Sequence, residues 1–224
     1  MAQTHTYGRA TKLFHRTATD SRRLAGVLFV ALAAQFLTVI MLASAMAPGY
    51  DFNRAAISDL GVTSETALLF NASLIVVGLF NVLGGYYFYR LHGERWLLAV
   101  FALAGLGALG AGLSPLDTGA PHSFSALLAF VFFNVEVLAS ASRLSGAMRA
   151  LGALAGIAGL VFVALMALGD SGTATAFGAI GHNGTERMIV YPGMLWLVAF
   201  GGYLLAPGSG DLTSPDRRTA DPVD

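Results

Sequence analysis

Long apolar runs alternate with short polar segments along the whole chain. Six of these runs are long and continuous, and they occupy 24–46, 67–89, 96–114, 123–142, 148–168 and 187–206. A helix needs roughly 20 residues to cross the hydrocarbon core of a bilayer. The runs do not alternate with period two, which excludes the strands of a membrane barrel. The pattern predicts an all-α polytopic membrane protein, built as a bundle of six transmembrane helices.

Polar segments flank the six apolar runs at both ends and so divide the chain into three parts. We expect residues 1–23 to form a cytoplasmic N-terminal tail and 24–206 to form the six-helix transmembrane domain. Residues 207–224 contain acids, arginines and no large hydrophobic cluster, which is typical of disorder. We therefore predict that they form a disordered cytoplasmic tail.

The distribution of basic residues predicts the orientation. Every lysine and arginine except Arg54 and Arg187 falls in a terminal tail, in the turn after the second run or in the turn after the fourth run. Such segments stay in the cytoplasm. We expect a multi-pass protein of the cell membrane with both termini cytoplasmic. The segments 47–66, 115–122 and 169–186 then lie on the outer side.

Composition agrees with a membrane location and excludes several classes of protein. Apolar residues make up 55% of the chain and charged residues 12%, against about 25% charged residues in soluble domains. The chain has no cysteine, which excludes disulfides, thiolate zinc sites and cysteine catalysis. Its net charge is zero, so a nucleic-acid partner has no electrostatic support. The expected partner is membrane lipid.

Polar residues collect in the three outer segments, and six of them form a candidate outer polar site: Ser58, Asp59, Asp117, His122, His182 and Glu186. We expect Asp59, His122 and His182 to meet in one shallow site. The role of these residues has three possible interpretations. They could form hydrogen bonds and ion pairs that hold the loops together, they could bind a metal ion, or they could form a proton or ligand site without metal. No catalytic residue, metal or cofactor is assigned from the sequence.

Some polar residues of the outer segments also stand where they could cap the N-terminus of a helix. Asn183 and Glu186 have the spacing of a capping box for the sixth run, and Ser64 stands where it could cap the second. His182 and Glu186 would share one face of a helix, but Gly184 argues against a continuous helix there.

Among the polar residues inside the predicted spans, we select Asn71, Asn81 and Glu136 as candidate intramembrane polar residues. A charged residue in mid-span costs about 2.5–3.5 kcal/mol on insertion scales, so we expect Glu136 to face the bundle interior. The three residues indicate either interhelical hydrogen bonds or a polar cavity or proton path.

Small residues recur four apart in two spans. Gly152 and Gly156 lie in the fifth run, and Ala104, Ala108 and Gly112 lie in the third. This spacing lets helix backbones approach closely. It predicts tight packing inside the bundle or, alternatively, homo-oligomer formation through these faces.

The segment Ile57-Ser58-Asp59-Leu60-Gly61, followed by Glu65 and by His122 at the start of the fourth run, resembles a six-span membrane family. That family includes the damage-regulated autophagy modulators and the lipid-remodelling factor of GPI-anchor maturation. The chain resembles more closely an uncharacterised prokaryotic six-span family with an SDLG motif and a domain of unknown function. The resemblance implies a function related to lipid, with Ser58, Asp59, Gly61, Glu65 and His122 as motif positions.

Three functions fit the sequence. The first is a lipid-binding or membrane-organising and regulatory protein with a polar site at the outer surface, and it is the one we favour. The second is a membrane-embedded, metal-dependent hydrolase or transferase acting on lipid head groups. The third is a transporter of protons or small solutes that uses Glu136. Whether the chain is an enzyme stays open.

Overall fold

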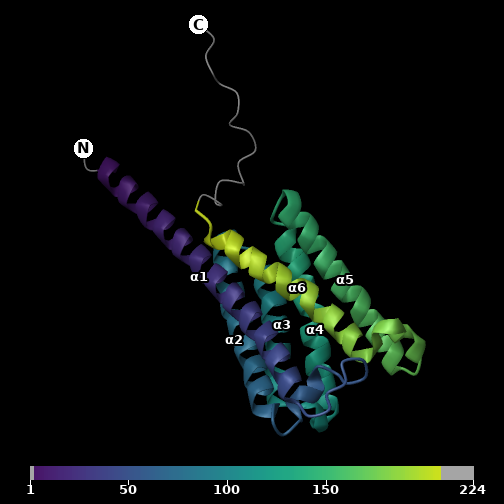
Figure 1. The fold of residues 1–224 in the computed structure, drawn as a ribbon. Helices are drawn as coiled ribbons and strands as arrows, with labels where there is room; N and C mark the ends of the chain where they lie inside the picture. The colour runs from purple at the N-terminus through teal and green to yellow at the C-terminus, as the bar shows by residue number, and fades with distance from the viewer. Residues whose placement is uncertain (1–2, 208–224) are drawn as a thin grey trace.

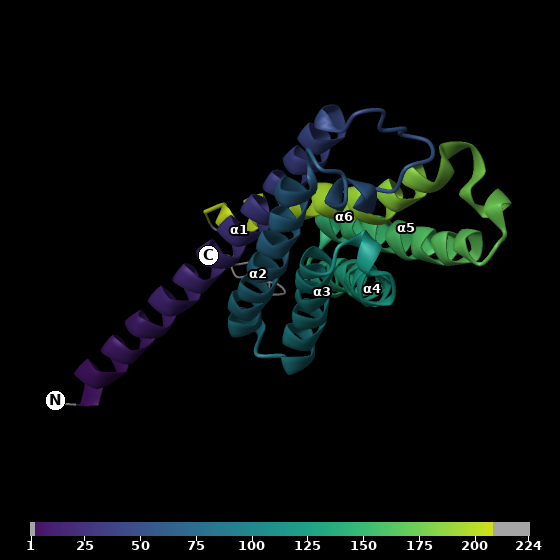
Figure 2. The same cartoon turned by 90° about the horizontal axis from the view of Figure 1, so that it is seen from below.

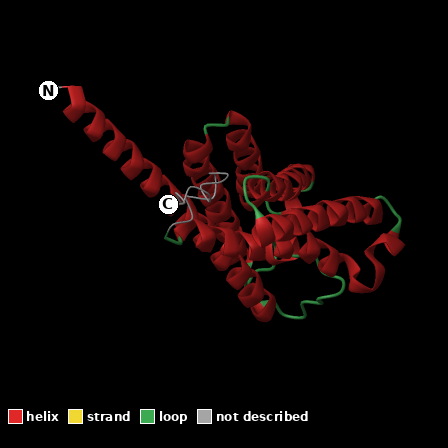
Figure 3. Ribbon diagram, turned by 90° about the horizontal axis from the view of Figure 1, so that it is seen from above, coloured by secondary structure: helices red, strands yellow, loops and turns green. Residues whose placement is uncertain are grey.

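The structure is a computed structural model that describes residues 3–207, with side chains from residue 18 onward. Its described residues form helices and connecting loops, with no strand among them (Figure 3). The main helices are α1 (Gln3–Met46), α2 (Ala67–His92), α3 (Arg95–Leu113), α4 (Ala120–Ala141), α5 (Gly146–Asp170) and α6 (Gly181–Leu205). Three short 3-10 helices join them, η1 (Ser58–Gly61), η2 (Leu116–Thr118) and η3 (Ala174–Ile180).

Six helical segments are long and apolar enough to cross a membrane, so the predicted all-α, multi-pass architecture is confirmed. Helix α1 begins at Gln3, although its apolar segment is Ala18–Met46. The helix therefore includes much of the segment expected as an N-terminal tail. The tail predicted for 207–224 lies outside the described residues, apart from residue 207.

The bundle has two different ends. Short turns after α2 and α4 lie at one end, called here the turn end. The segments 47–66, 114–119 and 171–180 lie at the other, called here the loop end. The predicted orientation puts the loop end on the outer side of the membrane.

Each helix packs against its neighbours in the chain, and α6 also packs against α1. Toward the loop end, α5 and α6 diverge from α4 (Figure 1), and the segment 47–66 reaches the start of α6, where the backbone of Asn53 lies against Gly181 (Figure 2). This divergence creates the space in which the candidate site lies.

An aromatic cluster holds the first, third and sixth helices together. The ring of Phe29 stacks on Phe101 at 5.5 Å and on Phe200 at 5.7 Å between centroids. All three side chains are fully buried. Large aromatic side chains contribute much of the buried area in such a core.

Small residues on α5 serve packing within the bundle, as predicted. A Cβ at Gly152 would meet Ala141 and Trp196, and one at Gly156 would meet Leu138. These glycines therefore lie against α4 and α6. Homo-oligomer formation stays a prediction.

The expected caps are wrong. Helix α6 begins at Gly181 and continues through Gly184, and no side chain caps it. Asn183 and Glu186 form bonds to other segments instead. Helix α2 has Thr66 at its N-cap position, and the Ser64 hydroxyl donates to the Glu65 carboxylate at 2.6 Å. That bond lowers the pKa of the exposed Glu65 carboxyl group.

Candidate functional site

A cavity of about 480 Å³ opens at the loop end between α4, α5 and α6. We call it the polar cavity. Part of its lining is polar and comes from the loops and helix ends: Arg54, Ser58, Asp59, His122, Ser123, Asp170, His182 and Glu186. The rest is mostly apolar and comes largely from α4 and α5: Leu127, Phe130, Val163, Met166 and Ala167.

Five of the six residues expected in the outer polar site line this one cavity: Ser58, Asp59, His122, His182 and Glu186. Asp117 does not, because η2 holds it on the exposed surface of its own loop. Within the described residues, no hydrogen bond joins Asp59 to His122 or His182. The expected residues thus share a cavity without forming one hydrogen-bonded cluster.

Asp59 mainly orders its own turn. Its carboxylate accepts a hydrogen bond from the backbone N–H of Ala56 at 2.7 Å, and the turn places Leu60 in the core with no exposed surface. Asn71 on α2 donates to the carbonyl of Gly61 at 2.8 Å. The Ser58–Gly61 motif is therefore fixed from both sides, and Asn71 belongs to this anchor rather than to a path through the membrane.

Glu186 links the first loop to α6. Its carboxylate accepts a hydrogen bond from the backbone N–H of Ile57, and its side chain is almost fully buried. The same side chain lines the polar cavity. The residue predicted as a cap therefore holds the motif against the site.

The two histidines have different partners. His122 is 5% exposed, and its Nδ1 lies 2.8 Å from the carbonyl oxygen of Ser114. A carbonyl only accepts, so Nδ1 carries a proton and donates this bond. His182 places Nε2 at 3.3 Å from the Asp170 carboxylate. This pair joins the start of α6 to the end of α5.

A metal centre is not assembled here. Among the described residues, no three His, Asp or Glu side chains are placed to hold a metal ion together. The polar cavity instead offers separate carboxylates, imidazoles and hydroxyl groups on different elements.

A second group of polar residues forms a hydrogen-bond network at the loop end, and no sequence pattern predicted this network. Asn183 donates to the Tyr50 hydroxyl at 2.5 Å, and Tyr50 donates to the carbonyl of Ala56 at 2.9 Å. Burial raises the pKa of the Tyr50 phenol, which therefore stays neutral and can donate. Arg187 bonds to Asn183 and Tyr191, and to Ser44 at 3.1 Å.

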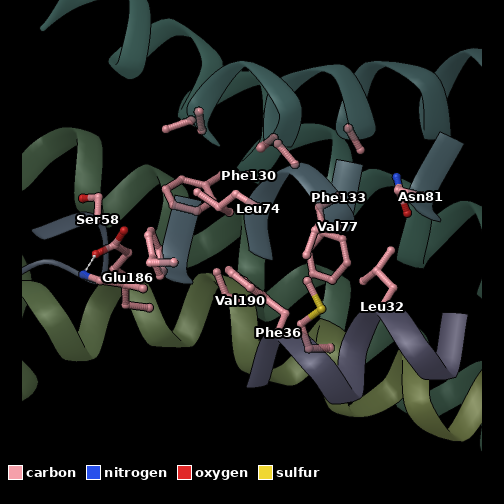
Figure 4. Close-up of a pocket in the computed structure, with 18 of the residues that line it drawn as sticks. Leu32, Phe36, Ser58, Leu74, Val77, Asn81, Phe130, Phe133, Glu186 and Val190 are labelled. Atoms are coloured by element: carbon pink, nitrogen blue, oxygen red, sulfur yellow. Dashed lines mark hydrogen bonds between the residues drawn. The ribbon is translucent and has the colours of Figure 1, made fainter. Parts of the chain in front are cut away.

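A smaller, mostly apolar cavity of about 80 Å³ adjoins the polar cavity on the side of the turn end. We call it the apolar chamber. Figure 4 shows it with Ser58 and Glu186 at one end and Asn81 and Leu32 at the other. The two cavities share five wall residues, which we call the throat: Ser58, His122, Ala126, Phe130 and Glu186. The two cavities are therefore neighbours, separated or joined at these five side chains.

A polar pair lies at the deep end of the chamber. Asn81 is 3% exposed, and its amide nitrogen donates to Glu136 at 2.7 Å and to the carbonyl of Phe101 at 3.0 Å. Glu136 is 1% exposed, so it faces the interior as expected. Asn81 Oδ1 and Glu136 Oε1 have no hydrogen-bond partner among the described residues.

The helices and the cavities define a multi-pass membrane protein with an internal site that opens at the loop end. The family described as protein of unknown function (DUF998) matches residues 21–203, so the chain belongs to this family. No curated protein and no solved structure matches the chain. The likeness to the autophagy modulators and to GPI-anchor remodelling stays a prediction.

Proposed function

We propose that the protein binds a membrane lipid in the polar cavity. The head group lies among the polar side chains at the loop end, and the lipid chains follow the apolar wall between α4 and α5. One observation carries this proposal. Leu127 on α4, a helix long and apolar enough to span the membrane, lines the polar cavity and is 52% exposed, so an apolar part of the cavity wall is open instead of sealed inside the bundle. An open apolar wall on a membrane-spanning helix is a surface on which lipid chains can pack.

The packing of α4 and α5 explains why the opening lies at this level. Nearer the turn end, in the middle part of α5, Gly156 lies against Leu138 and against the carbonyl of Asn134, so the two helices are in close contact. Nearer the loop end, Val163 and Met166 border the cavity instead. Lipid chains pack against such apolar side chains without the loss of any hydrogen bond.

The charges of the lining indicate the kind of head group. Asp59, Asp170 and Glu186 contribute carboxylate groups to the cavity. Arg54 is the single lysine or arginine among its lining residues, and its side chain is 88% exposed and lies 3.9 Å from Asp51. Carboxylates accept hydrogen bonds and attract cations. A head group with amine or hydroxyl donors therefore fits better than a bare phosphate.

Two alanines on α5 allow a matched test. Ala164 and Ala167 are both exposed and lie about one turn apart, but only Ala167 lines the polar cavity. Ala167→Trp should fill the cavity, whereas Ala164→Trp should add the same side chain on a surface outside it. Native mass spectrometry of protein purified in a mild detergent measures bound lipid per chain.

We expect wild type and Ala164→Trp to retain lipid, and Ala167→Trp to lose most of it. Equal lipid on the two variants would reject the polar cavity as the binding site. A wild-type chain that retains no lipid would reject the proposed function itself.

A further inference from the structure

The apolar chamber is long and narrow. Its wall on α6 runs from Glu186 to Met194, which corresponds to about 12 Å along a helix axis. Its volume of about 80 Å³ is small for that length. Ring systems and paired chains need a wider space, so the chamber can take no more than one alkyl chain.

The wall on α3 consists of small residues at three depths. Ala111, Ala108 and Ala104 line the chamber and are spaced three and four residues apart, so they lie on one face of the helix. Because α3 ends at Leu113 at the loop end, Ala111 is nearest the throat and Ala104 is deepest. They span about 10 Å along the helix axis.

Resting on the lipid binding proposed above, we propose that the apolar chamber takes one alkyl chain of the bound lipid out of the bilayer, and that Ala104, Ala108 and Ala111 set the chain length it accepts. The chain enters through the throat beside Phe130. Small side chains at these positions leave the space that the chain occupies.

The floor of the chamber limits how far the chain reaches. Asn81 lines the chamber, and its Oδ1 is buried without a partner among the described residues. An alkyl group in contact with that oxygen would leave a buried acceptor unsatisfied. A chain that ends just above Asn81 leaves room for a water molecule to donate to it. The polar floor thus gives the chamber a defined length.

Three single substitutions test the proposal in a graded way. Ala111→Leu, Ala108→Leu and Ala104→Leu each block the chamber at a different depth. Ala99→Leu is the control, because Ala99 lies on the same helix, is exposed and does not line the chamber. Each protein is loaded from vesicles of phosphatidylethanolamine, which has an amine head group, with short, medium and long saturated chains in equal amounts, and bound lipid is measured by mass spectrometry.

We expect the preferred chain length to decrease in the order wild type, Ala104→Leu, Ala108→Leu, Ala111→Leu, with Ala99→Leu equal to wild type. Valine at the same positions gives a milder block for any leucine variant that fails to fold, and should shift the preference in the same order. An identical chain-length profile in all folded variants would overturn the chamber as the chain site while lipid binding stands. Absence of lipid on wild type would overturn both proposals.

Discussion

Glu186 on α6 accepts a hydrogen bond from the backbone N–H of Ile57, which lies 129 residues earlier in the chain. Both residues are 3% exposed. This bond fixes the start of the Ser58–Gly61 motif against α6. It thereby places two throat residues, Ser58 and Glu186, next to each other (Figure 4).

Replacing Glu186 should separate its acceptor role from its charge. Glu186→Ala leaves the buried N–H of Ile57 without a partner, which costs about 1–3 kcal/mol. Glu186→Gln keeps an oxygen that can accept the bond, so we expect a smaller loss. Thermal unfolding in detergent measures both variants. Equal stability of wild type and Glu186→Ala would show that the bond does not anchor the loop.

Gly159 allows Asn134 to join two helices. Asn134 is fully buried, and its amide nitrogen donates to the carbonyl of Phe130 at 2.8 Å and of Ile189 at 3.1 Å. A Cβ at Gly159 would overlap the Asn134 side chain. We expect Gly159→Ala to lower stability by about 1–3 kcal/mol, as overpacking does.

Gly202 supplies the control for that experiment. It also lies within a helix, but a Cβ there would meet nothing within 4 Å. Gly202→Ala should therefore leave stability unchanged or raise it by up to about 1 kcal/mol, because alanine favours helix. Similar unfolding temperatures for the two alanine variants would contradict the role given to Gly159.

An ion pair joins the two turns of the turn end. Arg143 bonds to Glu94, and its guanidinium lies 5.4 Å from the centre of the Trp96 ring. The two charged side chains are about one third exposed. A double-mutant cycle of Glu94→Gln and Arg143→Gln should give a coupling energy of up to about 1 kcal/mol that decreases with salt. Additive effects of the two changes would mean that the pair contributes nothing.

The orientation is testable because the chain has no cysteine. Ala147 near the turn end and Ala174 at the loop end are exposed, and each can be replaced singly by cysteine. With an impermeant thiol reagent on intact cells, we expect labelling at 174 and none at 147. Labelling at 147 alone would reverse the predicted topology.

The helices were predictable because each apolar run is long enough to cross a membrane without help from other segments. Interior placement of Glu136 followed from the cost of a charge in lipid. The hydrogen-bond partner of Glu136 could not be predicted in this way. Asn71 and Asn81 both lie on α2, and only the fold shows that Asn81 contacts Glu136. Asn71 instead bonds to Gly61.

The site was predictable only in part. Polar residues in loops at one end of a bundle could be expected to gather, and five of the six line one cavity. The contact of Tyr50 with Asn183 joins residues 133 apart, and no local pattern signals it. The capping-box spacing of Asn183 and Glu186 was misleading, because both side chains bond to the first loop instead.

We propose that lipid binds in the polar cavity and not only around the bundle. Photo-crosslinking in membranes with a lipid that carries a diazirine on its chain, followed by peptide mass spectrometry, tests this most directly. Met41 on α1 is 67% exposed and lines neither cavity, whereas Met166 lines the polar cavity and is only partly exposed. We expect more adduct on Met166 than on Met41, and loss of that excess in Ala167→Trp. Adducts that simply follow exposure, with Met41 above Met166, would contradict the account.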